Sequence, residues 1–198
     1  MAVVLKRFIG ADINDYVSDL ARLRMDVFRS FPYLYDGDMG YEAEYIQTYS
    51  QSPRSLFVLA IDAGRVVGAA TGIPMADETE AFRKPFVERG YDPDSIFYFG
   101  ESVLLPEYRG QGIGVAFFEQ REGYADELGG FTHCCFCAVE RPLNHPLRPA
   151  DYQALDDFWR HRGYEKKPEL TTEYRWKDVG QSSETAKTMT FWMKKLNT

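Results

Sequence analysis

The chain has 198 residues, 44% of them hydrophobic and 27% charged, which suits one soluble globular domain with its own core, spanning residues 1–198. A formal net charge of -7 leaves no basic surface to neutralise phosphates, which argues against nucleic acid or an anionic membrane as a partner. Residues 1–8 lack the apolar core of a signal peptide, and no run of about 18 apolar residues occurs, so a cytoplasmic location is expected.

The first fifty residues combine a strand with helices. Residues 3–8 read as a short strand, and apolar residues at helical spacing predict a helix over 15–29, with Asn14 or Asp15 as its N-cap. An aromatic, turn-rich loop follows, and then a short helix over 42–49.

The middle of the chain is richer in strands. Two β-branched, apolar runs at 55–61 and 66–73 flank a short polar turn and predict a β-hairpin. A polar insert with helical spacing is expected at about 75–96. A third central strand then runs over 96–105 and ends at a proline.

The remaining elements complete a mixed α/β fold. A helix is predicted over 112–128, a strand buried on both faces over 131–139, and a short helix over 152–162. Strands are expected at 171–176 and 188–194. Together these elements predict one mixed sheet with helices on its faces.

The three cysteines, Cys134, Cys135 and Cys137, fall within one apolar segment and are too close together to form a disulfide framework. The chain has no C-x-x-C pair, and neighbouring residues on a strand point to opposite faces. The sequence therefore favours small buried hydrophobic residues here and no metal site.

Residues 100–114 carry the strongest functional signal, because an apolar strand, a proline and a charged turn lead into glycines that open a helix. Helix N-termini leave N–H groups unpaired, and glycines let a phosphate approach them. A Walker loop is excluded because Gly-Lys-Ser/Thr is absent. A dinucleotide-binding fingerprint is excluded because its last glycine would have to stand where the chain has Val115 or Phe117. The remaining pattern is Gln/Arg-x-x-Gly-x-Gly/Ala, met by residues 109–114.

With these residues the chain resembles the GNAT acyltransferases. Leu-Leu-Pro-Glu-Tyr-Arg-Gly-Gln-Gly-Ile-Gly at 104–114 is similar to the acyl-CoA signature of that superfamily, and 158–164 resembles its Phe-Tyr-x-x-x-Gly-Phe segment. The sequence segments 100–105 and 158–164 also resemble those of an uncharacterised bacterial branch of this superfamily. The resemblance implies a mostly antiparallel sheet of six to seven strands, splayed between its two middle strands, and acetyl-CoA as co-substrate.

The resemblance also implies the cofactor residues. The loop amides would hold the CoA pyrophosphate, the preceding strand would pair with the pantetheine arm, and an asparagine after the buried strand would touch that arm. These residues are Arg109, Gly110, Gln111, Gly112, Ile113, Gly114 and Val115 in the loop, Ser102, Val103 and Leu104 in the strand, and Asn144.

The implied reaction is N-acetyl transfer to a primary amine of a small molecule or peptide by direct attack in a ternary complex. Glu101 is the candidate general base, because burial near the thioester penalises its charged form and suits proton uptake near neutral pH. The alternatives are a structural ion pair or a carboxylate that binds a cationic substrate.

The residue at the position of the family's general acid differs from the family pattern. Trp159 stands where the family usually has tyrosine, and an indole cannot donate its proton usefully. Tyr164 is one catalytic substitute, with core packing as the alternative, while water, Cys135 or Cys137 could also protonate the thiolate.

The acceptor side is less specific. Aromatic residues could wall an acceptor pocket or simply anchor loops, and nearby acidic residues could favour a polyamine or other cation, or be solvated. The aromatic set is Phe31, Tyr33, Tyr35, Tyr41, Phe82 and Phe86, and the acidic set is Asp36, Asp38, Glu42 and Glu44. The missing tyrosine keeps a non-catalytic acyl-CoA sensor or scaffold as a second reading, and edge strands near the C-terminus are compatible with a homodimer.

Overall fold

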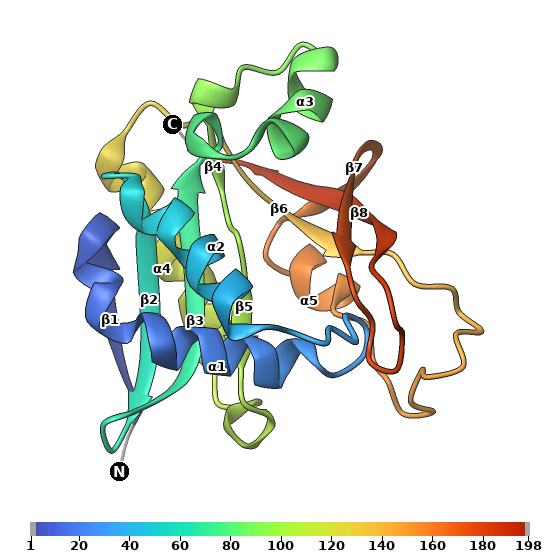
Figure 1. The fold of residues 1–198 in the computed structure, drawn as a ribbon. Coiled ribbons are helices and arrows are strands. Elements are labelled where there is room, and N and C mark those ends of the chain that lie inside the picture. The colour runs from blue at the N-terminus through green and yellow to red at the C-terminus, as the bar shows by residue number, and fades with distance from the viewer. Residues whose placement is uncertain (1–2, 197–198) are drawn as a thin grey trace.

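The computed structural model describes residues 3–196, and its centre is an eight-stranded sheet (Figure 1). Neighbouring strands follow the order β1-β2-β3-β4-β6-β8-β7, and β5 pairs with β3. All pairs are antiparallel except β4 with β6. The strands are β1 (Val4–Ile9), β2 (Leu56–Asp62), β3 (Arg65–Pro74), β4 (Ile96–Tyr98), β5 (Ser102–Leu104), β6 (His133–Val139), β7 (Glu165–Trp176) and β8 (Thr185–Lys195). The mixed, mostly antiparallel sheet with flanking helices is thus confirmed.

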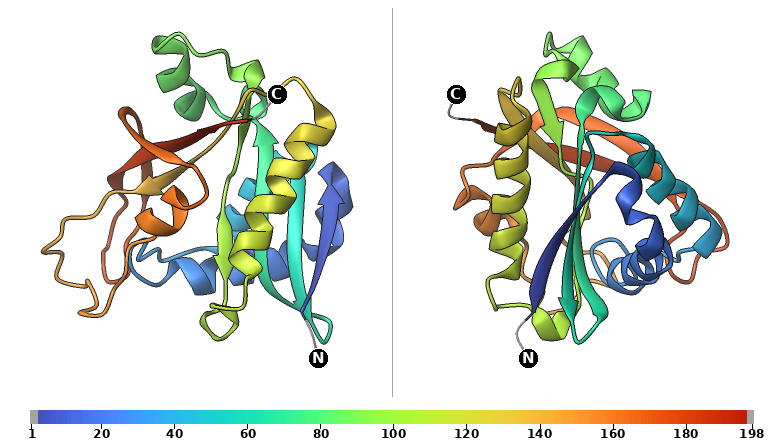
Figure 2. Two further views of the ribbon diagram at one scale, coloured as in Figure 1. Left: turned by 180° about the vertical axis from the view of Figure 1, so that it is seen from behind. Right: turned by 90° about the vertical axis from the view of Figure 1, so that its left-hand side faces the viewer.

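Helices cover both faces of this sheet (Figure 2). Helices α1 and α2 lie on one face, and α4 lies on the other. Helix α3 stands at the end of the sheet, within the segment predicted as an insert between β3 and β4. The helices are α1 (Val17–Phe28), α2 (Met39–Gln51), α3 (Glu80–Glu88), α4 (Ile113–Leu128) and the short α5 (Asp156–Arg160).

Helices α1 and α2 begin at residues other than those predicted. A 3-10 helix precedes α1 and contains both Asn14 and Asp15, so the predicted N-cap of α1 is wrong. Helix α2 begins earlier than predicted because the Asp38 carboxylate accepts hydrogen bonds from the N–H groups of Gly40 (2.9 Å) and Tyr41 (3.1 Å). Such a cap stabilises a first turn that apolar spacing alone does not reveal.

The predicted strand over 96–105 is broken into β4 and β5, which is why eight strands replace the six to seven expected. The break lies at Gly100, where an added Cβ would be 2.3 Å from Tyr49 Oη and 2.7 Å from Thr71 Oγ1, so only glycine fits. Before the break, β4 pairs with both β3 and β6. After it, β5 pairs only with β3 within the described residues. The sheet is therefore splayed between β5 and β6, as predicted.

The cysteines Cys134, Cys135 and Cys137 of β6 are free and buried, as the apolar pattern predicts. Burial raises the pKa of each thiol, so they remain protonated core residues near neutral pH. Across residues 3–196, no group of three or more His, Cys, Asp or Glu side chains is arranged to hold a metal ion. In the same range, no helix is long and apolar enough to cross a membrane.

Candidate functional site

The turn before α4 presents a row of unpaired backbone amides. Gly110 and Gly112 have φ values of +76° and +82°, in the left-handed region that favours glycine. Helix α4 begins directly after them, and no side chain caps it. The N–H groups from Gly110 through Val115 have no acceptor among residues 3–196. Because the positive end of the helix dipole lies at the same place, this turn is suited to bind an anion.

The approach to these amides is open. No heavy atom lies within 4 Å of a Cβ built at Gly110 or Gly112. The Arg109 side chain folds back, with Nε donating to the carbonyl of Leu104 at 3.3 Å. The first turn of α4 carries no acidic residue that would repel a phosphate. All seven predicted loop residues lie together here: Arg109, Gly110, Gln111, Gly112, Ile113, Gly114 and Val115.

Strand β5 offers a free edge next to this loop. The carbonyl of Glu101 accepts a hydrogen bond from β3 at 3.1 Å, and the N–H of Leu105 donates to β3 at 3.0 Å. Antiparallel pairing alternates, so Val103 also faces β3, while Ser102 and Leu104 direct their backbone groups to the splayed side. Two of the three predicted strand residues therefore present the free backbone edge.

Arg121 of α4 supports the break between β4 and β5. Its guanidinium donates to the carbonyls of Thr71 (3.3 Å) and Glu101 (3.1 Å) and to Ser102 Oγ (2.8 Å). It also lies over the Phe99 ring, 4.1 Å from the centroid. Burial lowers the pKa of Arg121 to about 10, so the side chain stays charged near neutral pH. A single cation thus binds the backbone of β3 and of Glu101 and contacts the Phe99 ring on the other side of Gly100.

A cavity of about 410 Å³ lies between the break and the helices α1 and α2. Its lining also includes residues of β6, β7 and the segment that leads into α2. Nine lining residues are aromatic: Phe28, Tyr33, Tyr35, Tyr41, Tyr45, Phe82, Tyr98, Tyr174 and Trp176. Of the predicted wall residues, Tyr33, Tyr35, Tyr41 and Phe82 line the cavity, and Phe31 and Phe86 do not.

A buried charge cluster lies in this cavity. Arg24 Nη1 is 2.7 Å from Glu101 Oε2, and Arg24 Nε donates to Glu42 Oε2. The side chains of Arg24, Glu42 and Glu101 are 8%, 0% and 3% exposed. Burial alone would lower the pKa of Arg24, but the charges of Glu101 and Glu42 raise it. Two carboxylates share one guanidinium, and Oε1 of each carboxylate is buried without a hydrogen-bond partner in the described residues.

Glu101 is therefore ion-paired, one of the alternatives that its sequence allowed, while its Oε1 remains available. Tyr45 Oη donates to Glu101 Oε2 at 3.1 Å and lies 3.3 Å from Tyr49 Oη. Tyr49 Oη in turn donates to Glu78 Oε1 at 2.5 Å. Burial raises the pKa of Glu78. The two hydroxyls thus stand in a row between the cavity and another buried carboxyl group, and they are hydrogen-bonded to each other when Tyr45 turns its single proton from Glu101 to Tyr49.

Tyr164 does not line the cavity, contrary to a catalytic role. It is 1% exposed and its hydroxyl donates to Glu122 Oε1 at 2.9 Å. Its ring lies 5.1 Å from Phe136, and Trp159 lies at the same distance from Phe136 on the same core cluster. Tyr164 is thus packed in the core, the alternative that its sequence position allowed, and this position gives no support to a role as acid.

Cys137 and Tyr98 are the candidate donors that do line the cavity. Tyr98 Oη and Cys137 Sγ are 3.2 Å apart. Burial raises the pKa of Cys137 to about 12 and raises that of Tyr98 as well. Both groups therefore stay protonated and are weak acids.

Asn144 is not brought to the cofactor loop. It is exposed in the proline-rich loop after β6, which extends away from the sheet (Figure 1). Its neighbour His145 packs against Phe31, with ring centroids 5.7 Å apart. The assignment of Asn144 to the pantetheine receives no support from this position.

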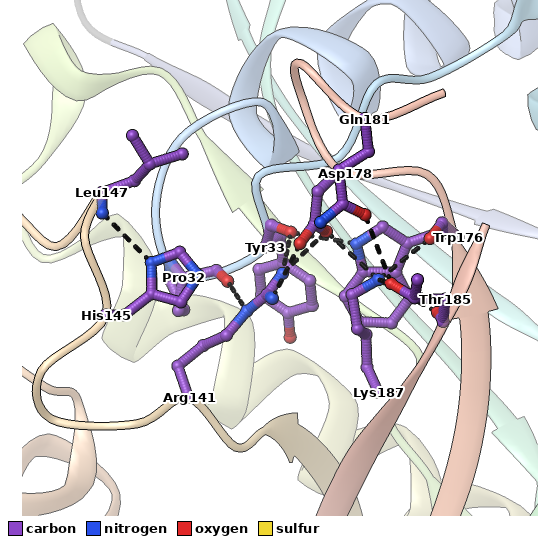
Figure 3. Close-up of polar contacts among 10 residues, drawn as sticks. All are labelled: Pro32, Tyr33, Arg141, His145, Leu147, Trp176, Asp178, Gln181, Thr185 and Lys187. Atoms are coloured by element: carbon purple, nitrogen blue, oxygen red, sulfur yellow. Dashed lines mark hydrogen bonds and ion pairs between the residues drawn. The ribbon is translucent and has the colours of Figure 1, made fainter. Parts of the chain in front are cut away.

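A second buried ionic cluster lies beside Tyr33 and Trp176, two residues of the cavity wall (Figure 3). Arg141 binds the Asp178 carboxylate through two hydrogen bonds of 2.9 Å, and Lys187 Nζ lies 3.3 Å from the same carboxylate. Arg141 also donates to the carbonyl of Tyr33 at 2.7 Å, and Trp176 Nε1 donates to that carbonyl at 2.9 Å. This cluster ties the segment before α2 to the β7–β8 hairpin and positions two rings of the cavity wall.

Sequence reasoning missed Arg24 and Arg121 as site residues, although a signal was present. Arg24 follows Leu20 and Ala21 at helical spacing, so it occupies the apolar stripe of α1. Arg121 is four residues after the buried Phe117. A charged residue within a buried stripe indicates a partner elsewhere in the fold, but the partner's identity requires the tertiary structure.

Comparison with known families and structures agrees with this geometry. The sequence model described as "Acetyltransferase (GNAT) family" matches residues 20–150. No curated protein matches the chain.

Several solved structures share the fold over nearly the whole chain. A ribosomal-protein-alanine N-acetyltransferase from Brucella melitensis is 16% identical with a TM-score of 0.60, and the match covers 98% of this chain and 99% of that chain. An acetyltransferase from Streptococcus agalactiae is 17% identical with a TM-score of 0.62, covering 98% of both chains. An N-acetyltransferase from Staphylococcus aureus is 12% identical with a TM-score of 0.60 and full coverage of both chains. At these identities the likeness shows the fold alone.

Proposed function

Because the chain belongs to the acetyltransferase (GNAT) family, we propose that it transfers an acetyl group from acetyl-CoA to the nitrogen of a primary amine. The observation that carries this proposal is the row of unpaired amides from Gly110 to Val115 beside the free edge of β5. An anion site next to an unpaired strand edge fits a cofactor with a diphosphate and an amide-containing arm.

The residues present fit acetyl-CoA. The amides of 110–115 would hold the pyrophosphate, and the backbone groups of Ser102 and Leu104 would pair with the pantetheine arm. When bound, acetyl-CoA supplies the activated acyl carbon of its thioester. The break at Gly100 separates β5 from β6 and leaves this edge without a protein strand.

In the overall reaction an ammonium first loses one proton to give the neutral amine; a carbon–nitrogen bond then forms and the carbon–sulfur bond breaks, the nitrogen loses a second proton, the sulfur gains one, and one proton is released to solvent. Glu101 Oε1 is the buried acceptor in the cavity that can take a hydrogen bond from the amine and then its proton. The hydroxyl chain through Tyr45 and Tyr49 to Glu78 offers a path for that proton away from the cavity.

Neither buried donor of the cavity suits the departing sulfur, which can leave as a thiolate and take up its proton from the bulk solvent. A free thiol has an ordinary pKa of about 8.5, whereas burial raises the pKa of Cys137 to about 12. Proton transfer from Cys137 to a thiolate is therefore unfavourable, and the same argument applies to Tyr98, whose pKa is also raised.

A non-catalytic acyl-CoA sensor is the second candidate, favoured by Trp159 in the place of the usual tyrosine and by its packing into the core. Calorimetry with CoA and acetyl-CoA, followed by thiol release over a panel of amines, separates the two functions. Binding with release supports transfer, whereas binding without release for any amine supports the sensor. Lack of CoA binding would reject both.

A further inference from the structure

The charge balance of the cavity calls for a cationic ligand. Glu42 and Glu101 share the single guanidinium of Arg24, so the buried cluster carries one excess negative charge. Each carboxylate has one buried oxygen without a partner in the described residues. A carboxylate oxygen can only accept hydrogen bonds, and an unpaired buried charge is costly. An ammonium group would satisfy both oxygens and neutralise the cluster.

The walls of the cavity indicate the kind of molecule to which that ammonium group belongs. Nine of its lining residues are aromatic, and its volume of about 410 Å³ suits a small organic molecule. The rings of Tyr33 and Trp176 belong to the outer segments that the Arg141–Asp178 cluster fixes in place. Aromatic walls favour a flat, apolar body over a polar chain.

Of the three carboxylates in the outer lining, Asp36 and Asp38 already have partners, and Glu184 is exposed to solvent. Asp36 pairs with Arg29 at 3.0 Å and with Lys177 at 2.8 Å. Asp38 caps α2. A polyamine needs further carboxylates along its length, and these two already have partners. A ligand with its own carboxylate would meet the excess negative charge of Glu42 and Glu101.

We propose that the acceptor is a small primary arylalkylamine without a carboxylate, whose ammonium contacts Glu42 and Glu101 and whose ring lies against the aromatic walls. This inference rests on the proposed acetyl transfer, and it adds the substrate class. Glu42 is then a determinant of acceptor binding, separate from the cofactor loop.

Binding to the wild-type protein tests the ligand class without any turnover. We expect 2-phenylethylamine to bind at neutral pH at least about tenfold more tightly than 2-phenylethanol, L-phenylalanine or spermidine. Fluorescence of Trp176 and calorimetry both report this binding. Equal affinity for the alcohol would overturn the role of charge, and preference for spermidine or L-phenylalanine would overturn the class.

Paired variants test the role of Glu42. We expect Glu42→Gln to weaken 2-phenylethylamine binding at least about tenfold while CoA affinity is unchanged. Glu44→Gln is the matched control, because Glu44 is exposed on the same helix and does not line the cavity. Equal amine affinity in both variants would overturn the proposal, and the wild-type ligand series decides the question if Glu42→Gln does not fold.

The proposed transfer and the proposed acceptor fail in different ways. Acetyl transfer to spermidine but not to arylalkylamines would leave the transferase intact and remove the acceptor class. Amine binding that depends on Glu42, without thiol release from acetyl-CoA, would reject the proposed acetyl transfer but support the proposed amine-binding site.

Discussion

Arg121 Nη1 donates to the main-chain carbonyl of Glu101 at 3.1 Å, so a helix on one face of the sheet fixes the backbone of the residue that faces the cavity on the other. The same guanidinium reaches Ser102 Oγ at 2.8 Å, on the strand with the free edge. One buried side chain thereby couples the cofactor edge to the acceptor cavity.

Arg121→Met should destabilise the protein, because carbonyls of Thr71 and Glu101 lose a buried donor. Each unsatisfied buried group costs about 1–3 kcal/mol, so we expect the free energy of unfolding in urea to fall by about 3 kcal/mol. Arg22→Met is the control, because that side chain is 67% exposed and should change the urea midpoint little. Equal midpoints for the two variants would contradict the assigned role.

Gly112→Val should reduce CoA affinity by at least about tenfold, because a side chain would stand at the unpaired amides and the backbone would leave its left-handed conformation. Gly130→Val is matched, since Gly130 also has φ of +82° and open space around its Cβ position. Both variants should lose similar stability in urea. Calorimetry that shows equal CoA affinity in the two would remove the loop from the cofactor site.

Glu101→Gln should lower kcat by about 100-fold or more, the usual effect of losing a general base, while CoA affinity changes little. The amide keeps the shape of the side chain but cannot accept a proton from the amine. Glu119→Gln, an exposed residue on α4, serves as the control. Wild-type turnover in Glu101→Gln, measured by thiol release, would exclude Glu101 from proton transfer.

Asp178→Asn should destabilise the protein at neutral pH by about 3 kcal/mol, because Arg141 and Lys187 lose their shared carboxylate. Burial opposes ionisation of Asp178, but the hydrogen bonds and charge of Arg141 and then of Lys187 lower its pKa. The stabilisation by the carboxylate is therefore complete above the ordinary pKa of about 4 and is lost as the pH falls below it.

The difference in urea midpoint between wild type and Asp178→Asn should accordingly narrow between about pH 4 and pH 2. Asp157→Asn provides the comparison, because Asp157 is 84% exposed and its pair with Arg160 is solvated. If the difference in urea midpoint between wild type and Asp178→Asn stays constant as the solution is acidified, the charge of Asp178 is not what stabilises the cluster.

The backbone conformation of the loop at 109–115 could be predicted because its signal is local. The glycines at 110 and 112 set a backbone conformation within a few residues, and the sequence around them carries the whole pattern. The splayed sheet followed from the same segment, although the break at Gly100 depends on the distant Tyr49 and Thr71.

The acceptor cavity could not be predicted at the same level. Arg24 and Glu101 form an ion pair only when α1 packs against the broken strand. The residues around each of them give no indication that the other is its partner. Asn144 rests on the resemblance alone, and Tyr164 is a substitute for the tyrosine that Trp159 replaces; the loop position of the first and the core packing of the second depend on the tertiary structure. Glu42 was among the acidic residues noted, but its burial beside Arg24 was not foreseen.

The clasp formed by Arg141, Asp178 and Lys187 has a consequence for how the protein can diversify. It joins cavity walls that come from distant parts of the chain. The turn proposed to bind the diphosphate, in contrast, lies within one continuous segment. If the protein binds CoA and an amine as proposed, substitutions in those outlying walls would change the acceptor specificity without changing the affinity for CoA.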